Sequence, residues 1–297
     1  YAAVERGIAS FTKVNVPDSW KTAKDETVVD SKRPEFISKV VDVINGQKGD
    51  DLPVSTFTGI EDGTFPMGTS AYEKRGIAVT VPEWQSDKCI QCNRCSLVCP
   101  HAAIRPFLLT DAEKAAAPAG MVTLPASGPQ FKGLQYKIQC STLDCAGCGN
   151  CVDACPAKEK ALVMMPQAEQ NVAEIPNWDY LIEKVTVKDD LAPLNTVKNS
   201  QFAQPLLQFS GACAGCGETP YLKAITQLYG DRMMIANATG CSSIWGGSAP
   251  ATVYCKDKNG KGPAWANSLF EDNAEYGLGM ALGVEQIREH IAGTMDK

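Results

Sequence analysis

Residues 89–100 read Cys-Ile-Gln-Cys-Asn-Arg-Cys-Ser-Leu-Val-Cys-Pro, with two residues between successive members of the first three cysteines and three before the fourth. The same spacing returns at residues 145–156, Cys-Ala-Gly-Cys-Gly-Asn-Cys-Val-Asp-Ala-Cys-Pro, so the chain contains an internal repeat. A short apolar run follows each copy, at residues 102–104 and 161–163. One tight loop with three thiolates can bind three corners of an iron–sulfur cube, and the fourth corner then needs a ligand from elsewhere.

Each run can supply the ligand that the other lacks. In proteins with two such runs, the fourth cysteine of each run ligates the cluster of the other run. The repeat therefore predicts two [4Fe–4S] clusters in a module of the bacterial ferredoxin type. The expected ligands are Cys89, Cys92, Cys95 and Cys155 for the first cluster and Cys145, Cys148, Cys151 and Cys99 for the second. Zinc is the weaker interpretation, because zinc sites prefer two separated Cys pairs or Cys/His pairs, which neither run contains.

Two features around the second run bear on this interpretation. Gly147 and Gly149 fit a cluster site, because backbone N–H groups of a glycine-containing loop can approach the sulfurs and tune the potential. Cys140 forms a plant-type C-x4-C-x2-C spacing with Cys145 and Cys148. Since the eight-cysteine pattern is complete without it, we expect Cys140 to be a buried free thiol.

A strand–helix–strand pattern is predicted after residue 205. Residues 206–209 read as a strand, Thr219-Pro220 as the N-cap and first position of a helix that ends at Gly230, and residues 233–236 as a second strand. This order indicates a right-handed βαβ unit with two parallel strands. The loops after the two strands are expected to meet at one edge of the sheet, where α/β proteins bind cofactors.

These two loops carry Cys213, Cys216 and Cys241, which we expect to ligate a third [4Fe–4S] cluster. Taken alone, the Cys213 and Cys216 pair is also compatible with a redox dithiol or half of a zinc site. The fourth ligand stays open: Cys255 lies in a stretch that reads as a hairpin, residues 253–261, so a ligand outside this chain is favoured. The free N–H groups at the start of the helix suit a diphosphate or carboxylate, although a simply capped helix explains them equally well.

Composition and charge limit the class of protein. The chain has 297 residues, 44% of them hydrophobic and 21% charged, which is enough for two domains. No apolar run approaches the roughly 18 residues of a membrane span, and the first 30 residues do not resemble a signal peptide. The net charge of −6, without a basic block, argues against nucleic acid or a membrane surface as the main partner. The 13 cysteines indicate metal binding in a reducing, cytoplasmic setting rather than disulfides.

The chain is expected to contain three parts. Residues 1–70 read as a connector with one helix near residues 34–46, residues 71–186 as the ferredoxin-like domain with a strand at 76–81, and residues 187–297 as the first part of a parallel-sheet α/β domain. The region between the two cysteine runs reads as a surface insertion. The expected fold class is thus α+β and α/β. Because the sequence begins at Tyr1 rather than Met, we interpret it as a piece of a longer protein.

Several longer motifs resemble the family of pyruvate:ferredoxin oxidoreductases, which are thiamine diphosphate enzymes. Besides the doubled cysteine run, the matching motifs are Asp62-Gly-Thr-Phe-Pro66, Tyr72-Glu-Lys-Arg-Gly-Ile-Ala-Val79, Gly211-Ala-Cys-Ala-Gly-Cys-Gly-Glu-Thr-Pro220, Asn237-Ala-Thr-Gly-Cys-Ser-Ser-Ile-Trp-Gly-Gly247 and Ser268-Leu-Phe-Glu-Asp-Asn-Ala-Glu-Tyr-Gly277. These motifs are spread over most of the chain. The resemblance implies the central part of that enzyme, with the ferredoxin-like domain followed by the start of the thiamine-diphosphate-binding domain.

The resemblance implies oxidative decarboxylation of pyruvate to acetyl-CoA and carbon dioxide. It implies thiamine diphosphate with Mg2+ as cofactor, coenzyme A as co-substrate, and three [4Fe–4S] clusters that pass electrons to ferredoxin or flavodoxin. By match to the family motifs, the cluster nearest the cofactor uses Cys213, Cys216 and Cys241 together with a cysteine far downstream. Glu218 and Cys241 stand where the family contacts thiamine diphosphate, and the family suggests a homodimer.

The chain also departs from the family. It is much shorter and contains no Gly-Asp-Gly magnesium and diphosphate motif. The residues that bind pyruvate, the glutamate that activates the cofactor and most coenzyme A contacts lie outside it. We therefore expect no catalytic residue in this segment, and no activity from the segment alone. Two other functions stay open: a dicluster ferredoxin-type carrier without catalysis, and a related oxidoreductase for a longer 2-oxoacid such as 2-oxoglutarate.

Overall fold

The computed structural model describes residues 1–23 and 33–295 of a chain that divides into two units, residues 1–34 and 35–297. The smaller unit contains α1 (Ala2–Ala9) and a 3₁₀ turn at Asp18–Thr22, and no residue of either element is buried. The part of the predicted connector at residues 24–32 lies outside the described residues. Both copies of the cysteine repeat belong to the larger unit.

The larger unit begins with the helix predicted near residue 40. A π-helical turn at Ile37–Val41 continues into α2 (Asp42–Asn45), and Gly46 ends the helix. The apolar residues Ile37 and Val41 are each 1% exposed, so the helix buries the side that the sequence pattern indicates. The chain then passes through 3₁₀ turns at Gly49–Asp51, Val54–Phe57 and Thr69–Tyr72 before it reaches the first strand.

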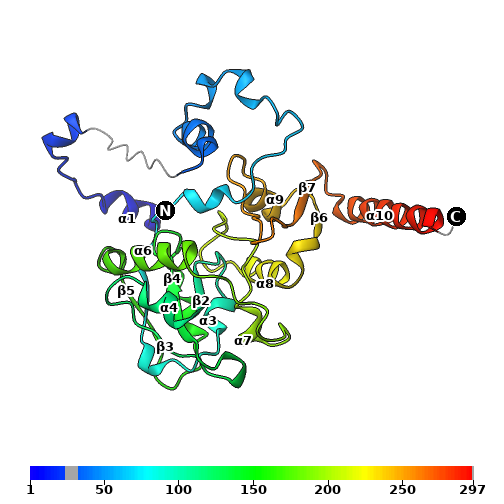
Figure 1. Ribbon diagram of the computed structural model, residues 1–297. Coiled ribbons are helices and arrows are strands. Elements are labelled where there is room, and N and C mark those ends of the chain that lie inside the picture. The colour runs from blue at the N-terminus through cyan, green and yellow to red at the C-terminus, as the bar shows by residue number, and fades with distance from the viewer. Residues whose placement is uncertain (24–32, 296–297) are drawn as a thin grey trace. The chain divides into compact units, whose positions relative to one another are not determined.

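The cysteine repeat folds twice into a strand, a cysteine loop with a short helix, and a second strand. The first copy comprises β1 (Thr80–Trp84), α3 (Arg94–Leu97) and β2 (Ile104–Leu109), and the second comprises β4 (Gln135–Cys140), α5 (Asn150–Asp153) and β5 (Leu162–Pro166). β1 pairs with β5 and β2 pairs with β4, both antiparallel, so each sheet takes one strand from each copy (Figure 1). This pairing brings the two cysteine loops together.

β1 starts later than the strand predicted at residues 76–81. Gly76 has a φ of 60°, and the side chains of Ile77 and Val79 are 67% and 86% exposed. The alternation of apolar residues therefore does not mark a half-buried strand face here. The strand runs instead from Thr80 to Trp84, where it pairs with Leu162.

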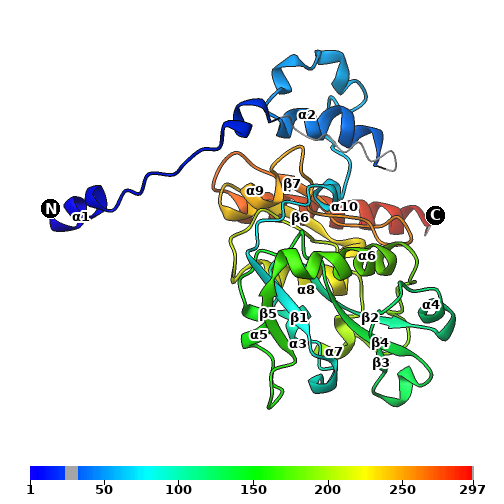
Figure 2. The same cartoon turned by 90° about the vertical axis from the view of Figure 1, so that its left-hand side faces the viewer.

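Aromatic side chains fill the core of this module. Tyr136 is fully buried and Phe131 is 1% exposed, and the Phe202 ring packs against both, with ring centroids 6.3 Å and 5.1 Å away. Phe131 comes from the segment between the two copies, which also forms α4 (Asp111–Ala115) and β3 (Leu124–Pro125), the latter paired antiparallel with β4. The segment predicted as a surface insertion thus also contributes to the core. α6 (Gln167–Glu183) packs against β1, β4 and β5 (Figure 2).

The C-terminal part contains a parallel strand pair. β6 (Met234–Asn237) and β7 (Ala264–Asn267) pair in parallel, from Met234 opposite Ala264 to Asn237 opposite Asn267. The helices of this part are α7 (Val197–Ser200), α8 (Thr219–Tyr229), α9 (Cys241–Gly246) and α10 (Asn273–Met295). α10 packs against β6, and none of its described residues is buried. Among all described helices, none combines the length and the apolar character that crossing a membrane requires.

The strand predicted at residues 206–209 is wrong, and so is the βαβ unit built on it. Leu207 makes one isolated antiparallel bridge, to Tyr254, and Phe209 has a φ of 52°, which is incompatible with an extended strand. Leu206 is buried by packing instead: a Cβ added to Gly230 would lie 2.9 Å from its Cδ1. The parallel partner of β6 is therefore β7, which follows α9 along the chain.

Candidate iron–sulfur and cofactor site

The four cysteines predicted for the first cluster line one pocket, and we call them the first thiol set. Cys89 and Cys92 lie in the loop before α3, Cys95 lies on α3, and Cys155 follows α5. Apolar side chains from β1, β4 and β5 complete the wall. Three members thus come from the first copy of the repeat and one from the second.

The second thiol set has the reciprocal arrangement. Cys145 and Cys148 lie in the loop before α5, Cys151 lies on α5, and Cys99 follows α3, and all four line a second pocket. The structure therefore groups the eight side chains as the crosswise pattern predicts. Because each pocket needs a cysteine from both copies, neither copy can form its site alone.

Backbone N–H groups point to the sulfurs at matching positions of the two copies. In the loops, the N–H groups of Gln91 and Gly147 lie 3.4 Å from Cys89 Sγ and Cys145 Sγ, respectively. After the loops, the N–H of Ala103 lies 3.3 Å from Cys99 Sγ, and that of Ala161 lies 3.4 Å from Cys155 Sγ. Such hydrogen bonds stabilise the thiolate form that binds iron and shift cluster potentials.

The thiols at these pockets are free, and burial opposes the ionisation of two of them. All 13 cysteines are free thiols. Burial raises the pKa of Cys95 and of Cys151 strongly, so these thiols ionise only when positive charge is supplied, as bound iron does. Within residues 1–23 and 33–295, no three Cys, His, Asp or Glu side chains are placed to hold a single metal ion. Four soft sulfur donors around a pocket, with N–H groups directed at them, fit a [4Fe–4S] cluster.

Cys140 is buried, as the sequence predicted, but it is also tied to the second thiol set. Its thiol hydrogen-bonds to Cys145, which lowers the pKa of Cys145 and raises that of Cys140. Trp84 stands at the matching position of the first copy, five residues before Cys89, and lines the pocket of the first thiol set. Burial raises the pKa of the Cys89 thiol. Sequence reasoning missed Trp84, although its offset from the repeat identifies it.

The third thiol set, Cys213, Cys216 and Cys241, is more open. Cys213 and Cys216 lie in the loop before α8, and Cys241 is the first residue of α9, after β6. Cys213 and Cys241 are exposed. Burial opposes ionisation of Cys216, but the N–H groups of Thr219 and Glu218 hydrogen-bond to its sulfur and leave its pKa lowered.

Cys255 lies in the core, as a structural thiol would. It is 6% exposed, its thiol donates a 3.5 Å hydrogen bond to the Pro205 carbonyl oxygen, and burial raises its pKa to about 11. The chain turns just after it, where the Asp257 N–H bonds to the Lys261 carbonyl oxygen at 2.7 Å, but residues 253–261 form no strand pair of the predicted hairpin.

The loop that carries Cys213 and Cys216 lies against the second thiol set. The Gly215 N–H hydrogen-bonds to Cys148, partly opposing the rise in its pKa that burial causes. His101, two residues after Cys99, places its Nε2 2.8 Å from the Ala212 carbonyl oxygen. The loop of Cys213 and Cys216 thus directly adjoins the second thiol set, through Gly215 and Cys148.

The N-terminus of α8 faces the same loop. Its N-cap is Glu218 rather than the predicted Thr219, and no side chain caps it. Pro220 occupies the first turn and Gly230 ends the helix, as predicted. Thr219 is fully buried beside the Cys216 thiol. Because the Glu218 and Thr219 N–H groups already bond to the Cys216 sulfur, the helix start alone does not indicate an anion site.

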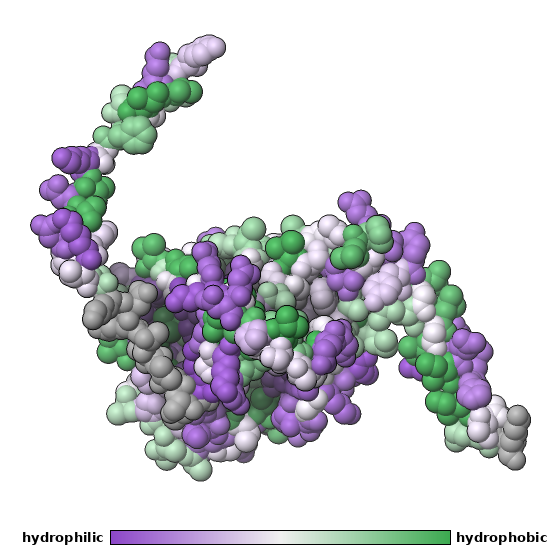
Figure 3. All heavy atoms as spheres, turned by 90° about the horizontal axis from the view of Figure 1, so that it is seen from above, coloured by the Kyte–Doolittle hydropathy of each residue, from purple (hydrophilic) through white to green (hydrophobic). Residues whose placement is uncertain are grey.

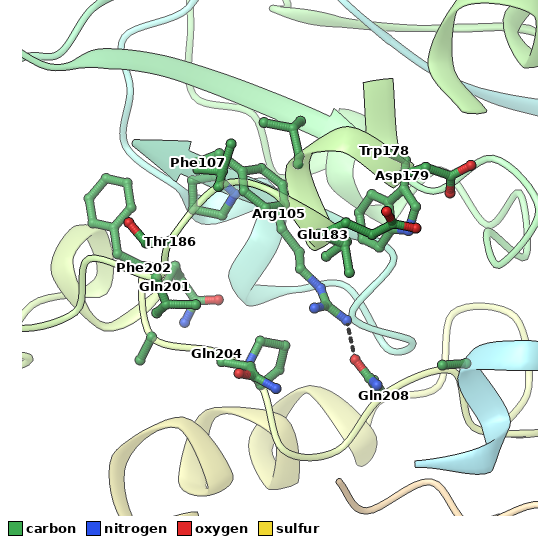
Figure 4. Close-up of a pocket in the computed structure, with 18 of the residues that line it drawn as sticks. Arg105, Phe107, Trp178, Asp179, Glu183, Thr186, Gln201, Phe202, Gln204 and Gln208 are labelled. Carbon is green, nitrogen blue, oxygen red and sulfur yellow. Dashed lines mark hydrogen bonds between the residues drawn. The ribbon is translucent and has the colours of Figure 1, made fainter. Parts of the chain in front are cut away.

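A cavity of about 390 Å³ is lined by no cysteine. Figure 4 shows Arg105 reaching into it from β2 toward Gln208. The guanidinium donates to the Ala102 carbonyl oxygen at 2.7 Å and to Gln208 Oε1 at 2.6 Å, and lies 5.2 Å from the Trp178 and Phe209 ring centroids. Burial lowers its pKa to about 10. Arg105 thus ties β2 to α6 and to the segment before the third thiol set, a role that no sequence pattern indicates.

The chain matches two domain models and several individual proteins. Residues 22–78 match the model described as EKR, a domain of unknown function, and residues 88–159 match a 4Fe-4S dicluster domain. The whole chain is 57% identical to the pyruvate:ferredoxin oxidoreductase of Moorella thermoacetica, and 98% of it is 58% identical to the pyruvate-flavodoxin oxidoreductase of Enterobacter agglomerans. Over 86% of its length, the chain is 55% identical to the pyruvate dehydrogenase [NADP(+)] of Cryptosporidium parvum.

These matches confirm the resemblance that the motifs indicate. The chain spans about a quarter of the length of the first two relatives, 25% and 24%, and 13% of the third. It therefore corresponds to a segment of the long pyruvate:ferredoxin and pyruvate-flavodoxin oxidoreductases, and it contains their dicluster domain.

Proposed function

We propose that this chain is the electron-relay segment of a pyruvate:ferredoxin or pyruvate-flavodoxin oxidoreductase. The complete enzyme would convert pyruvate and coenzyme A to acetyl-CoA and carbon dioxide and pass the electrons to ferredoxin or flavodoxin. The proposal rests on one observation: eight thiols form two interlocked sets. The chain that contains them is, over all of its own residues, 57% identical to a quarter of such an enzyme.

The first and second thiol sets would each hold one [4Fe–4S] cluster, which accepts and releases one electron at a time. The chain supplies four thiolates to each cluster from both copies of the repeat. It also supplies the N–H groups of Gln91 and Gly147, and Cys95 and Cys151 are buried. Because hydrogen bonds and exposure set cluster potentials, these residues would tune the relay.

Electrons would enter this relay through the third thiol set. Cys213, Cys216 and Cys241 would ligate a third cluster, with its fourth ligand from outside the chain, because Cys255 is held in the core. The Gly215 contact with Cys148 supports this entry point, because it brings the loop of Cys213 and Cys216 next to the second set. The order of transfer is therefore third set, second set, first set, and then the external acceptor.

The C-terminal part would hold one side of a thiamine diphosphate site with its Mg2+. Support comes from Glu218 at the start of α8, Cys241 at the start of α9 and the parallel β6–β7 pair. Glu218 and Cys241 would contact the cofactor, and the catalytic groups and most of the coenzyme A site would lie outside this chain. On this proposal residues 1–70, 71–186 and 187–297 are the connector, ferredoxin-like and cofactor-binding domains of a cytoplasmic homodimer.

The test is pyruvate-dependent and coenzyme A-dependent reduction of ferredoxin by the intact protein, purified without air. Cys241→Ala should lower this rate by at least tenfold while both ferredoxin-type EPR signals persist, because the relay then loses its entry point. Cys255→Ala is the matched control and should keep the rate within about twofold. Normal turnover of Cys241→Ala would contradict the role of the third set, and a wild-type protein that carries clusters but neither binds thiamine diphosphate nor uses pyruvate would be a simple carrier.

A further inference from the structure

Lys223 is a buried cation on the side of α8 that contacts the ferredoxin-like module. Its side chain is 1% exposed, and its ammonium donates hydrogen bonds to the Ser96 carbonyl oxygen and, at 3.0 Å, to Gln201 Oε1. Ser96 directly follows Cys95 on α3 and precedes Cys99 by three residues. The ammonium therefore lies beside the turn that supplies one ligand to each thiol set.

The buried face of α8 is unusual because it is polar. Leu222, Ile225 and Leu228 have helical spacing in the sequence, but none of the three is buried. The residues that α8 buries are Thr219, Lys223, Thr226 and Gln227. A helix normally buries its apolar stripe, so the burial of a lysine here needs a specific partner.

That partner is not a carboxylate, because no acidic side chain of the described residues pairs with Lys223. Burial lowers the pKa of Lys223 to about 8; the Cys99 and Cys95 thiols favour its charged form, and Arg105 opposes it. Burying an unpaired ammonium is costly. The thiolates of the two occupied sets would supply the missing negative charge.

We propose that Lys223 raises the reduction potentials of both ferredoxin-type clusters by placing a buried positive charge beside the Ser96 carbonyl, in the turn that carries Cys95 and Cys99. The inference rests on the proposed function and deepens it. Reduction adds one electron to a cluster, and no bond forms or breaks. Because a nearby cation stabilises the added negative charge, it makes each cluster easier to reduce.

The effect should be larger for the second cluster. Of the two thiols, Cys99 interacts more strongly with Lys223 than Cys95 does, and Cys99 belongs to the second thiol set. Salt screens a buried charge only weakly, so the difference should persist at physiological ionic strength. Lys223 would thus favour electron entry from the third set into the second.

A purely structural role is the simplest competing explanation. Lys223 ties α8 to α3 and to Gln201, and losing this tie would lower stability whatever the clusters do. Stability alone therefore does not separate the two roles. The reduction potential does, because a neutral structural tie leaves it unchanged.

The experiment is an EPR-monitored redox titration of the intact protein, loaded with its clusters under anaerobic conditions. Lys223→Met removes the charge and keeps the length of the side chain. Gln201→Glu leaves Lys223 in place but sets a carboxylate where its amide oxygen lies 3.0 Å from the ammonium, which neutralises the charge with little change in shape. Thr226→Val is the control, because it removes a hydroxyl from the same buried face without a change in charge.

Both charge variants should lower the potential of the second cluster by about 59 mV, a tenfold change in the equilibrium constant of a one-electron couple. The first cluster should shift in the same direction by less, and Thr226→Val should shift neither. If Lys223→Met does not fold, Gln201→Glu decides alone. Unchanged potentials, or an equal shift in Thr226→Val, would overturn the inference, whereas a wild-type protein without two cluster signals would overturn the proposed function itself.

Discussion

The two copies of the cysteine repeat reach the same backbone geometry with different residues. Both copies have positive φ angles at the second and fourth positions after the first cysteine, 56° and 59° at Gln91 and Asn93 and 68° and 78° at Gly147 and Gly149. In both copies the first of these positions directs its N–H to the first sulfur. The cluster loop thus requires the left-handed conformation, and glycine is only one means of reaching it.

In the first copy, the side chains of Gln91 and Asn93 make hydrogen bonds that the glycines of the second copy cannot make. Gln91 donates to the Pro125 carbonyl oxygen at 2.8 Å and accepts from the Ser127 N–H at 2.8 Å, which fixes the segment between the copies. Asn93 donates to the Lys198 carbonyl oxygen at 2.7 Å and accepts from the Tyr136 hydroxyl at 2.6 Å. The first copy therefore anchors the surrounding chain, whereas in the second copy Gly147 lies against Thr80 and Ala78 and Gly149 has open space beside it.

The crosswise exchange between the copies gives the largest expected effect. Cys99→Ala should remove the cluster of Cys145, Cys148 and Cys151 although the mutation lies in the first copy. Iron content should fall by about four ions per chain, because each [4Fe–4S] cluster holds four. Iron analysis and EPR of the reduced variant measure this, and a spectrum in which only the other cluster changes would contradict the exchange.

Gly147 and Gly149 differ in the space around them. A Cβ at Gly147 would lie 3.0 Å from the Thr80 carbonyl oxygen and 3.3 Å from Ala78 Cβ, but one at Gly149 would meet nothing within 4 Å. Gly147→Ala should destabilise the holoprotein by about 2–3 kcal/mol through backbone strain plus this contact. Gly149→Ala should cost only the strain, about 1 kcal/mol. Anaerobic urea unfolding followed by circular dichroism compares them, and equal losses would show that contact with β1 is unimportant.

Exchanging the residues at the fourth position of the two loops tests the anchoring role of the first copy. Asn93→Gly suits the positive φ but leaves the buried Tyr136 hydroxyl without its acceptor, so it should destabilise by about 1–2 kcal/mol. The reciprocal Gly149→Asn enters open space in a conformation that Asn tolerates and should change stability by less than about 0.5 kcal/mol. The same unfolding assay applies. Losses of stability of similar size in both variants would contradict the proposed anchoring role of the first copy.

Glu113, between the two copies, gives the smallest effect, and it depends on pH. Burial raises its pKa, but hydrogen bonds from Lys188 and from the Thr110 and Thr186 N–H groups outweigh this and lower it to about 2. The carboxylate therefore contributes stability above its unfolded pKa of about 4.5, and this contribution disappears as the pH falls toward 2.

Glu113→Gln should thus lower stability by about 1–2 kcal/mol at pH 7, and the difference from wild type should narrow below pH 4.5. Thermal unfolding followed by circular dichroism at stepped pH measures this difference, in which any acid sensitivity common to both proteins cancels. A difference that stays constant from pH 7 to pH 3 would show that the ionised form has no special role.

Sequence reasoning succeeded where spacing fixes geometry. The doubled run predicted which cysteine joins which set, because three thiols on one tight loop leave their fourth partner to the other copy, and the pockets group the eight residues in this way. The helix ends at Gly46 and Gly230 were also predicted, although neither glycine has a positive φ. At Gly230 the close approach of Leu206 leaves no space for a Cβ.

It failed where tertiary packing decides. Residues 206–209 are buried like a strand, but they pack against Gly230 and turn at Phe209. Lys223 could not be found from the sequence, because a lysine on a helix is normally solvated, and only the position of α3 shows what its ammonium contacts. The sequence likewise did not predict that β6 pairs with β7, because α9 lies between these two strands along the chain.

Metal and sulfide analysis of the intact protein, purified without air, tests the central claim most directly. The first and second thiol sets predict about four iron and four acid-labile sulfide ions each, and no stoichiometric zinc. Two interacting [4Fe–4S] signals should appear on reduction. Zinc in place of iron, with no inorganic sulfide, would contradict the account.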